Sequence, residues 1–202
     1  MAKVVSFTNK KGGVGKTTTV VNMAAYCADF GKRMLLIDLD SQGNATTGLG
    51  FSKSALKKSV YNVLIDDEKI SANILPTQVP LLDILPANVD LTGAEVELVY
   101  KRNRDRILKT ALEEVKDKYD YIFIDCPPSL GLLTINALTA ADSVLIPIQC
   151  EYYALEGVTK LLESMKMVKS RLNKGLDTYG VLMTMYDSRT SCLLYTSPSP
   201  RD

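Results

Sequence analysis

Three lysines and three glycines near the start of the sequence lie in a loop that is suited to binding phosphate. The run reads Lys10-Lys11-Gly12-Gly13-Val14-Gly15-Lys16-Thr17-Thr18. Its glycines let backbone N–H groups turn inward around an anion, because no Cβ stands in the way. Lys16 can reach the β- and γ-phosphates of a nucleotide, and the hydroxyl of Thr17 can ligate the magnesium ion that accompanies a triphosphate. The sequence therefore predicts a nucleotide site here.

The segments on either side of the loop agree with this chemistry. Apolar residues 4–7 predict a strand before it, and residues 17–30 carry apolar side chains at helical spacing up to Gly31, a residue typical of a helix end. A helix that begins at the loop directs the positive end of its dipole at the bound anion. The alternative is a Gly-rich turn in an unrelated fold, and the flanking strand and helix argue against it.

Carboxylates follow two further apolar runs. Residues 34–37 predict a parallel strand buried on both faces, which places Asp38 and Asp40 at its C-terminal end, where ligands bind in open α/β sheets. Residues 121–124 predict a strand that ends in Asp125, an arrangement in which the carboxylate holds a magnesium-bound water. The segment 41–50 is rich in Gly and Asn, which indicates a functional loop.

The rest of the chain alternates between helical and strand patterns. We expect helices near 60–64, after Leu91, and over 103–118, 130–141 and 154–172, with strands at 81–85, 144–148 and 179–185. This alternation predicts an α/β fold with a mainly parallel twisted sheet that helices cover on both faces. The charged 103–118 segment is interpreted as a solvated outer helix rather than a binding surface, with Ile107, Leu108, Ala111, Leu112 and Val115 facing inward.

Composition limits the classes of function that are open. A chain of 202 residues with 46% hydrophobic residues suits one globular domain. A formal net charge of +1 argues against an electrostatically dominated nucleic-acid binder, so any DNA contact must come from a local patch. The sequence has no histidine, and its four cysteines show no C-x-x-C spacing. Without a signal sequence or a membrane-spanning run, a reducing cytoplasm is the expected compartment.

The last residues, 192–202, abandon the alternation of helices and strands. They look like an in-frame translation of a transposon-end sequencing adapter, so we leave them out of fold reasoning. A genuine Ser/Pro-rich flexible C-terminus is the alternative. We therefore expect one ATPase-like domain over residues 1–191, incomplete at its C-terminus, followed by a non-native tail.

These motifs together resemble the ParA/Soj chromosome- and plasmid-partitioning ATPases, members of the deviant Walker A superfamily of ParA and MinD. The loop departs from the standard G-x-x-x-x-G-K-[ST] pattern, since Lys10 stands at the first Gly position and Lys11 is the additional lysine of this superfamily. Residues 36–46, 125–130 and 149–157 also look like family blocks, and the last points to the chromosomal Soj branch. Ser41 stands where the family usually has Pro. Pro would stiffen the turn, so its replacement by Ser is expected to loosen the loop.

The resemblance implies a P-loop NTPase fold that hydrolyses ATP, with ATP and magnesium as its cofactors. It implies catalytic roles for Lys11, Lys16, Asp40 and Asp125, with Asp40 orienting the attacking water, and metal roles for Thr17, Asp40 and Asp125. The residues implied to bind the nucleotide are Lys11, Gly12, Gly13, Val14, Gly15, Lys16, Thr17 and Thr18. For Asp38, a supporting carboxylate and a structural strand-end residue are both open.

The resemblance also implies partners. Lys11 is expected to reach the nucleotide of a second copy, so ATP binding would produce a homodimer. Arg189, after the last apolar strand, is expected to contact DNA phosphates without sequence preference. The basic residues Lys166, Lys169, Arg171 and Lys174 either extend this patch or form an ordinary solvated helix face. A ParB/Spo0J-like protein is the expected stimulator of hydrolysis, and no membrane contact is expected.

Two alternatives stay open and one is set aside. A MinD-like membrane-cycling ATPase would need a C-terminal amphipathic helix and carries D-G-L-R-N-L-D where this sequence has Ser41-Gln42-Gly43-Asn44. A non-hydrolysing nucleotide-dependent regulatory switch is the second alternative. An iron–sulfur site like that of nitrogenase iron proteins is not expected, because Cys126 and Cys150 lie in family blocks tied to strands and nucleotide.

Overall fold

The computed structural model describes residues 1–150 and 154–186, and this part of the chain is built around a twisted seven-stranded sheet. The strands are β1 (Lys3–Phe7), β2 (Met34–Asp38), β3 (Leu75–Pro76), β4 (Leu82–Leu85), β5 (Tyr121–Asp125), β6 (Ser143–Gln149) and β7 (Asp177–Thr184). Their order in the sheet is β3-β4-β2-β5-β1-β6-β7. Only the short β3 runs antiparallel to its neighbour, so the predicted mainly parallel α/β sheet is confirmed.

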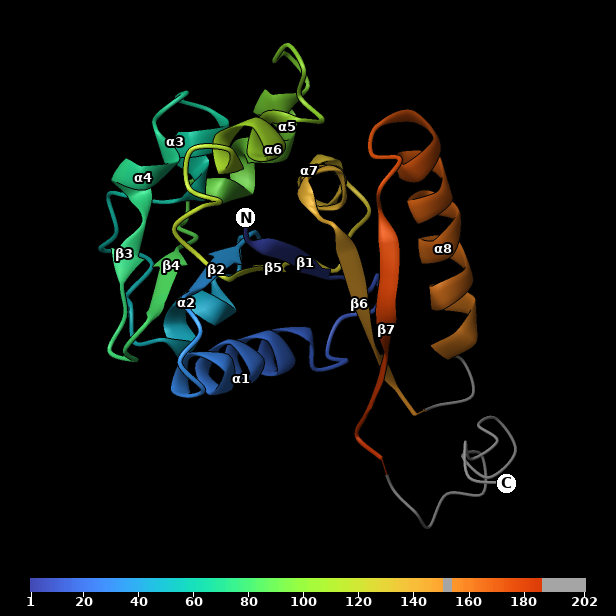
Figure 1. Ribbon diagram of the computed structural model, residues 1–202. Helices are drawn as coiled ribbons and strands as arrows, with labels where there is room; N and C mark the ends of the chain where they lie inside the picture. The colour runs from blue at the N-terminus through green and yellow to red at the C-terminus, as the bar shows by residue number, and fades with distance from the viewer. Residues whose placement is uncertain (151–153, 187–202) are drawn as a thin grey trace.

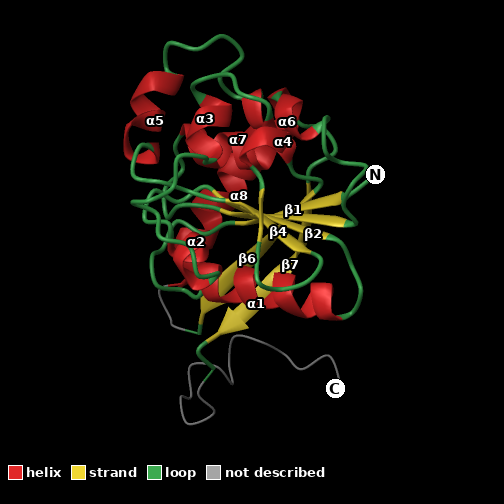
Figure 2. Ribbon diagram, turned by 90° about the vertical axis from the view of Figure 1, so that its left-hand side faces the viewer, coloured by secondary structure: helices red, strands yellow, loops and turns green. Residues whose placement is uncertain are grey.

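Helices cover the sheet on both faces, as Figures 1 and 2 show. One face carries α1 (Lys16–Asp29) and α2 (Asn44–Gly48). The opposite face carries α3 (Val60–Leu64), α4 (Ile70–Asn73), α5 (Leu91–Leu98), α6 (Ile107–Leu112), α7 (Leu132–Ala140) and α8 (Ala154–Arg171). Each face has its own apolar core, because successive side chains of a strand point to opposite sides.

The central strands are buried on both faces, which explains their unbroken apolar sequences. Every residue of β2 is buried; Leu35 and Ile37 pack into the core beneath α3 to α8, and Met34 and Leu36 pack toward α1. The same pairing continues through β5, where Asp38 lies beside Asp125 in the parallel register. Burial of these strands fixes the register, and the register brings the carboxylates to one edge of the sheet.

The outer helix expected over 103–118 is much shorter in the structure. Only Ile107–Leu112 is α-helical. Asn103 adopts a left-handed conformation with φ 53°, and the amides of residues 113–115 bond to carbonyls three residues back, as in a tightened turn. The expected inward face is nevertheless confirmed, since Leu108 and Leu112 are fully buried and residue 115 packs with them.

Strand β7 occupies the end of the sheet and differs from the other parallel strands in its exposure. The prediction of a strand near 179–185 is confirmed with bounds at Asp177–Thr184. Its side chains are largely exposed, including Tyr179, Val181 and Met183, because only β6 pairs with it in the described residues. The predicted DNA contact Arg189 and the tail 192–202 lie outside the residues that the structure describes.

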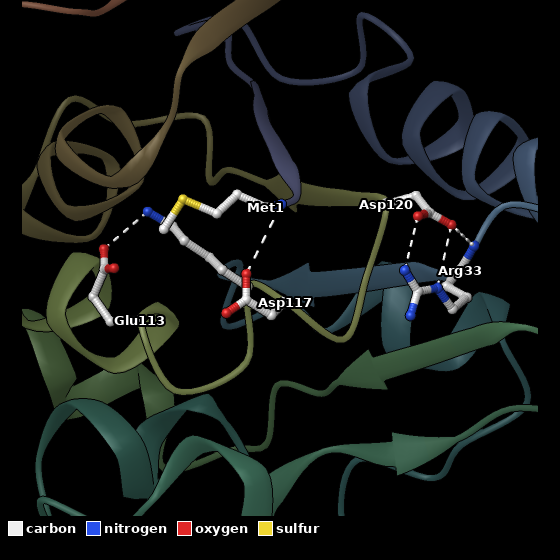
Figure 3. Close-up of polar contacts among 6 residues, drawn as sticks. Met1, Arg33, Glu113, Asp117 and Asp120 are labelled. Atoms are coloured by element: carbon white, nitrogen blue, oxygen red, sulfur yellow. Dashed lines mark hydrogen bonds and ion pairs between the residues drawn. The ribbon is translucent and has the colours of Figure 1, made fainter.

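At the edge of the sheet where β2 and β5 begin, a paired Arg33 and Asp120 connect the two strands (Figure 3). The guanidinium and the backbone N–H of Arg33 both donate to the Asp120 carboxylate, and Asp120 N–H donates back to the Arg33 carbonyl at 2.8 Å. These hydrogen bonds hold the pKa of Asp120 down at about 2.

In the described part of the chain, no helix has the length and hydrophobicity needed to cross a membrane.

Candidate nucleotide site

The phosphate-binding loop predicted from sequence lies between the end of β1 and the start of α1. Gly13 and Gly15 have φ angles of 73° and 81°, a left-handed backbone conformation that residues other than glycine rarely adopt. Gly15 forms the N-cap of α1, and the first helical residue is Lys16. The loop therefore brings several backbone N–H groups and a helix N-terminus to one place, which is the geometry of an anion nest.

The two lysines of the loop lie in different surroundings. Lys16 is buried, and its Nζ donates to the backbone carbonyl of Lys11 at 3.2 Å. Burial lowers the pKa of Lys16, and the nearby charges of Asp125, Cys126 and Asp40 oppose that shift. Lys11 is exposed, while its backbone N–H is held by Asn9 Oδ1 at 3.0 Å. The loop thus presents one lysine toward the carboxylates and one at its outer surface.

Helix α1 and strand β5 meet at a hydrogen bond between Thr17 and Asp125. The Thr17 hydroxyl donates to Asp125 Oδ2 at 2.7 Å, and Asp125 is completely buried. The other carboxylate oxygen, Oδ1, is buried and has no hydrogen-bond partner. Burial, and secondarily the charge of Asp38, raise the pKa of Asp125 to about 7. A buried carboxylate oxygen without a partner indicates that a further group belongs beside it.

Magnesium fits these residues, because the hydroxyl of Thr17 and the unpartnered Oδ1 of Asp125 are hard oxygen donors of the kind the ion prefers. Among the described residues there is no cluster of three or more acidic, cysteine or histidine side chains that could hold a metal by itself. Mg²⁺ commonly takes few protein ligands and completes its shell with water and phosphate oxygens. The arrangement therefore suits an ion that arrives with a nucleotide.

Asp38 connects the end of β2 to the loop that follows it. Asp38 is fully buried and accepts hydrogen bonds from the backbone N–H of Asp40 and from both the N–H and the hydroxyl of Thr46, the latter at 2.7 Å. Thr46 Oγ1 in turn accepts from the N–H of Ala87 at 2.9 Å. Burial raises the pKa of Asp38 to about 6, although these hydrogen bonds oppose the shift. Asp38 thus ties down the loop that carries Asp40.

A cavity of about 560 Å³ opens beside the loop. Seven residues predicted from sequence line it, namely Gly12, Gly13, Gly15, Lys16, Thr17, Thr18 and Asp40. Val14, Asp125 and Lys11 are not among its lining residues. Val14 is buried, and Asp125 accepts a hydrogen bond from the lining residue Thr17. Sequence reasoning missed Met185, which lines the cavity from the end of β7. It also missed Thr46 and Ala87, whose contacts join segments distant in sequence.

A second cavity, of about 620 Å³, lies between α7 and α8. Aliphatic side chains make up much of its lining, together with charged residues that include Lys101, Arg104 and Arg171. It lacks a glycine loop with inward N–H groups, so the smaller cavity is the better nucleotide site although it has less volume. The carboxylates, the buried lysine and the helix N-terminus all lie at the smaller one.

The fold and this site define a P-loop nucleoside triphosphatase of the deviant Walker A type. Residues 2–178 match the family model described as an AAA domain. The chain is 57% identical over 191 residues to the sporulation initiation inhibitor protein Soj of Bacillus subtilis, covering 95% of this chain and 76% of that protein. It is 51% identical over 191 residues to the chromosome partitioning protein ParA of Myxococcus xanthus, covering 95% and 68%. The chain belongs to the ParA/Soj family of chromosome-partitioning ATPases.

A solved structure supports the same fold under a different name. A protein of Mycobacterium smegmatis named cobyrinic acid a,c-diamide synthase, with bound ADP and magnesium, superposes with a TM-score of 0.92 and 44% identity, covering 96% of this chain and 79% of that one. The partitioning relatives are more similar in sequence than this protein, at 57% and 51%. The name of the Mycobacterium protein therefore does not change the family assignment.

Proposed function

We propose that this chain binds ATP with magnesium in the cavity beside the P-loop and hydrolyses it as a pair of protomers that hold DNA. The observation that carries the proposal is the Thr17–Asp125 hydrogen bond, which leaves Asp125 Oδ1 buried and unpartnered where a hydrated metal ion would complete it. Phosphoryl transfer asks the protein mainly to position groups and to stabilise charge. The residues lining the cavity are of the types needed for both.

Each of these residues has a separate task in the proposal. Backbone N–H groups of residues 12–16 bind the phosphates, Lys16 neutralises their charge, and Thr17 with Asp125 holds the metal. Magnesium supplies further neutralisation of the β- and γ-phosphate oxygens when it is bound. Asp40 orients the attacking water, because it lies at the cavity wall and its Oδ1 is fixed by the N–H of Gln42 at 2.9 Å.

Lys11 acts across the dimer in this proposal. Its backbone is fixed on both sides, since its N–H donates to Asn9 and its carbonyl accepts from Lys16. Its side chain belongs to an exposed residue at the outer surface of the loop. A lysine in that place suits a phosphate bound by a second copy, where it would do what an arginine finger does in other NTPases. ATP binding would then control the oligomeric state.

DNA binding is proposed to follow from dimerisation. Arg189 comes five residues after β7 ends at Thr184, and Lys166, Lys169 and Arg171 are exposed on α8. Phosphate contacts of this kind give salt-dependent, sequence-independent binding, and pairing two copies multiplies weak contacts by avidity. A net charge of +1 agrees with a local patch rather than a uniformly basic surface. The chain would then reside on the nucleoid in the cytoplasm.

We further propose that a ParB/Spo0J-like partner stimulates hydrolysis and that residues 192–202 are not native. The alignments with the curated relatives span 190 or 191 of the 202 residues, which leaves room for a short segment outside the family domain. A nucleotide-dependent regulatory switch that does not hydrolyse ATP is the second candidate. The name of the Bacillus subtilis relative, a sporulation initiation inhibitor, agrees with the regulatory part of this candidate only.

Multiple-turnover ATP hydrolysis with random duplex DNA and a ParB-type protein separates these functions. The proposal predicts turnover that rises when both are added, and DNA binding that requires ATP and weakens as salt is raised. Arg189→Ala should weaken binding to random duplex and reduce the salt slope by about one. Less than one turnover per protomer under all conditions would favour the switch. Unchanged DNA affinity and salt slope would remove Arg189 from the proposal.

A further inference from the structure

The end of strand β7 contacts the phosphate-binding loop through Thr184. The hydroxyl oxygen of Thr184 lies 2.8 Å from the carbonyl oxygen of Val14 in the loop and 3.1 Å from that of Ile148 in β6. The carbonyl of Thr184 also accepts from the N–H of Cys150 at 3.2 Å. Thr184 and Val14 are 170 residues apart in the sequence, so this hydrogen bond joins the end of β7 to a loop near the start of the chain.

The contact with Val14 has a consequence for the next amide of the loop. The peptide bond between Val14 and Gly15 is trans, as are all those described, so its C=O and N–H point in opposite directions. The C=O is directed at Thr184. The N–H of Gly15 is therefore directed away from Thr184, and Gly15 lines the nucleotide cavity. By holding one end of the peptide unit, Thr184 orients a donor of the anion nest.

The packing around Gly15 agrees with a tight junction. A Cβ built on Gly15 would lie 3.6 Å from the methyl group of Thr184, which is van der Waals contact. The next residue, Met185, has φ 53° and lines the same cavity. A residue other than glycine adopts a positive φ angle only where its surroundings favour that backbone conformation. Thr184 at the end of β7 and Met185 directly after it thus both lie at the nucleotide site.

We propose that Thr184 is a positioning residue for phosphate binding, and that it couples occupancy of the nucleotide site to the end of β7. Its single hydroxyl proton can be given to Val14 or to Ile148, not fully to both. Phosphate drawn into the nest favours the donation to Val14, because that donation holds the Gly15 N–H on the ligand. The inference rests on the proposed nucleotide binding and extends it to regulation of the same site.

The first test measures nucleotide affinity with a fluorescent ATP analogue and magnesium. Thr184→Val keeps the shape and removes the hydroxyl, and we expect about fivefold weaker binding, the effect of one ordinary hydrogen bond. Thr184→Ser restores the hydroxyl and should bind within about twofold of the unmodified chain. Thr178→Val, at the exposed start of the same strand, is the control and should bind normally. Normal affinity in Thr184→Val, or equally weak binding by Thr184→Ser, would overturn the positioning role.

The second test measures coupling by hydrogen exchange, first in the unmodified chain, where the result does not depend on the folding of a variant, and then in Thr184→Val. ATP should slow exchange of the β6–β7 ladder and of the Cys150 amide, which donates to Thr184, as well as of the loop itself. In Thr184→Val at saturating nucleotide, the loop should still be protected and the β7 end should not. Loop protection without any change at β7 in the unmodified chain would overturn the coupling.

The two tests separate failure of this inference from failure of the proposed function. If the unmodified chain binds no ATP analogue, the proposed function fails. If it binds the analogue and Thr184→Val behaves identically in affinity and in exchange, the function stands and the inference about Thr184 is wrong. Circular dichroism of each variant establishes that it is folded before either result is read.

Discussion

Thr17 and Asp125 are joined by a 2.7 Å hydrogen bond, although they lie 108 residues apart in the sequence. The bond connects the first turn of α1 to the last residue of β5. It engages one oxygen of a completely buried carboxylate and leaves the other without a partner. A buried oxygen without a partner indicates that a further group belongs beside it, and the magnesium ion of the proposed function would be that group.

The first prediction concerns the charge of this carboxylate. Asp125→Asn keeps the shape and an acceptor for Thr17 but removes the negative charge. We expect ATP turnover to fall by roughly 100-fold or more, as for loss of one preorganised electrostatic contact, and half-maximal turnover to require more magnesium. Steady-state turnover against magnesium concentration measures both effects. Asp117→Asn, whose side chain is 83% exposed, is the matched control, and equal turnover in the two variants would contradict the metal role.

The second prediction concerns pH. Burial raises the pKa of Asp125 to about 7 and that of Asp38 to about 6, well above the ordinary value of an aspartate. From the ordinary aspartate pKa of about 4 up to about pH 7, the folded chain therefore binds more protons than the unfolded chain. Its stability falls as the pH rises across this window. The two groups together account for about 4 kcal/mol over this interval, so we expect the Tm without nucleotide to drop by roughly 10 °C between about pH 5 and pH 8.

Thermal unfolding followed by circular dichroism at several pH values provides the measurement. Asp125→Asn removes one of the two titrating groups and should flatten the curve. A Tm that rises steadily over this interval in the unmodified chain would show that these carboxylates do not control stability near neutral pH.

The third prediction concerns the loop that carries Asp40. Thr46→Val removes the hydroxyl that donates to Asp38 and leaves the buried N–H of Ala87 without its acceptor. The free energy of unfolding should fall by about 1–3 kcal/mol. Because Asp40 is then held less firmly, kcat should fall more than KM for ATP changes. Denaturant unfolding and steady-state kinetics measure the two effects.

The neighbouring Thr47 offers the control for that experiment. Its hydroxyl donates to the carbonyl of Gly43 at 2.9 Å, and the residue is exposed. Thr47→Val should alter stability and turnover little. If it were as damaging as Thr46→Val, the effect would belong to α2 in general and not to the Asp38–Thr46–Ala87 connection.

The strands and the phosphate loop could be predicted from sequence because their signals are local. A buried parallel strand needs a continuous apolar run, and the runs that end at Asp38 and Asp125 were placed within one residue of their observed bounds. The loop glycines were predicted to let backbone N–H groups turn inward, and Gly13 and Gly15 have the positive φ angles that suit glycine. Sequence spacing was sufficient to bring the carboxylates to the edge of the sheet where the loop lies.

Contacts between distant segments could not be predicted in this way. The bonds of Thr46 to Ala87 and of Thr184 to Val14 depend on how the strands and loops assemble, and neither residue stands out by type. The short helix α2 was missed because its Gly/Asn-rich sequence favours a loop, and Gly43 starts it with φ 62°. The overlong helix at 103–118 shows the converse, since helical periodicity continues through residues that form turns.

The central claim is that Lys11 of one copy contacts the phosphates of the ATP bound by a second copy and so completes that nucleotide site. Analytical ultracentrifugation with magnesium and ATP tests it most directly, using Asp40→Ala to slow hydrolysis and a fluorescent nucleotide to verify binding. We predict a dimer for Asp40→Ala and a monomer for the Lys11→Ala, Asp40→Ala double variant, with nucleotide bound in both. A dimer of equal strength in both variants, or the absence of any ATP-dependent dimer in the first, would contradict the account.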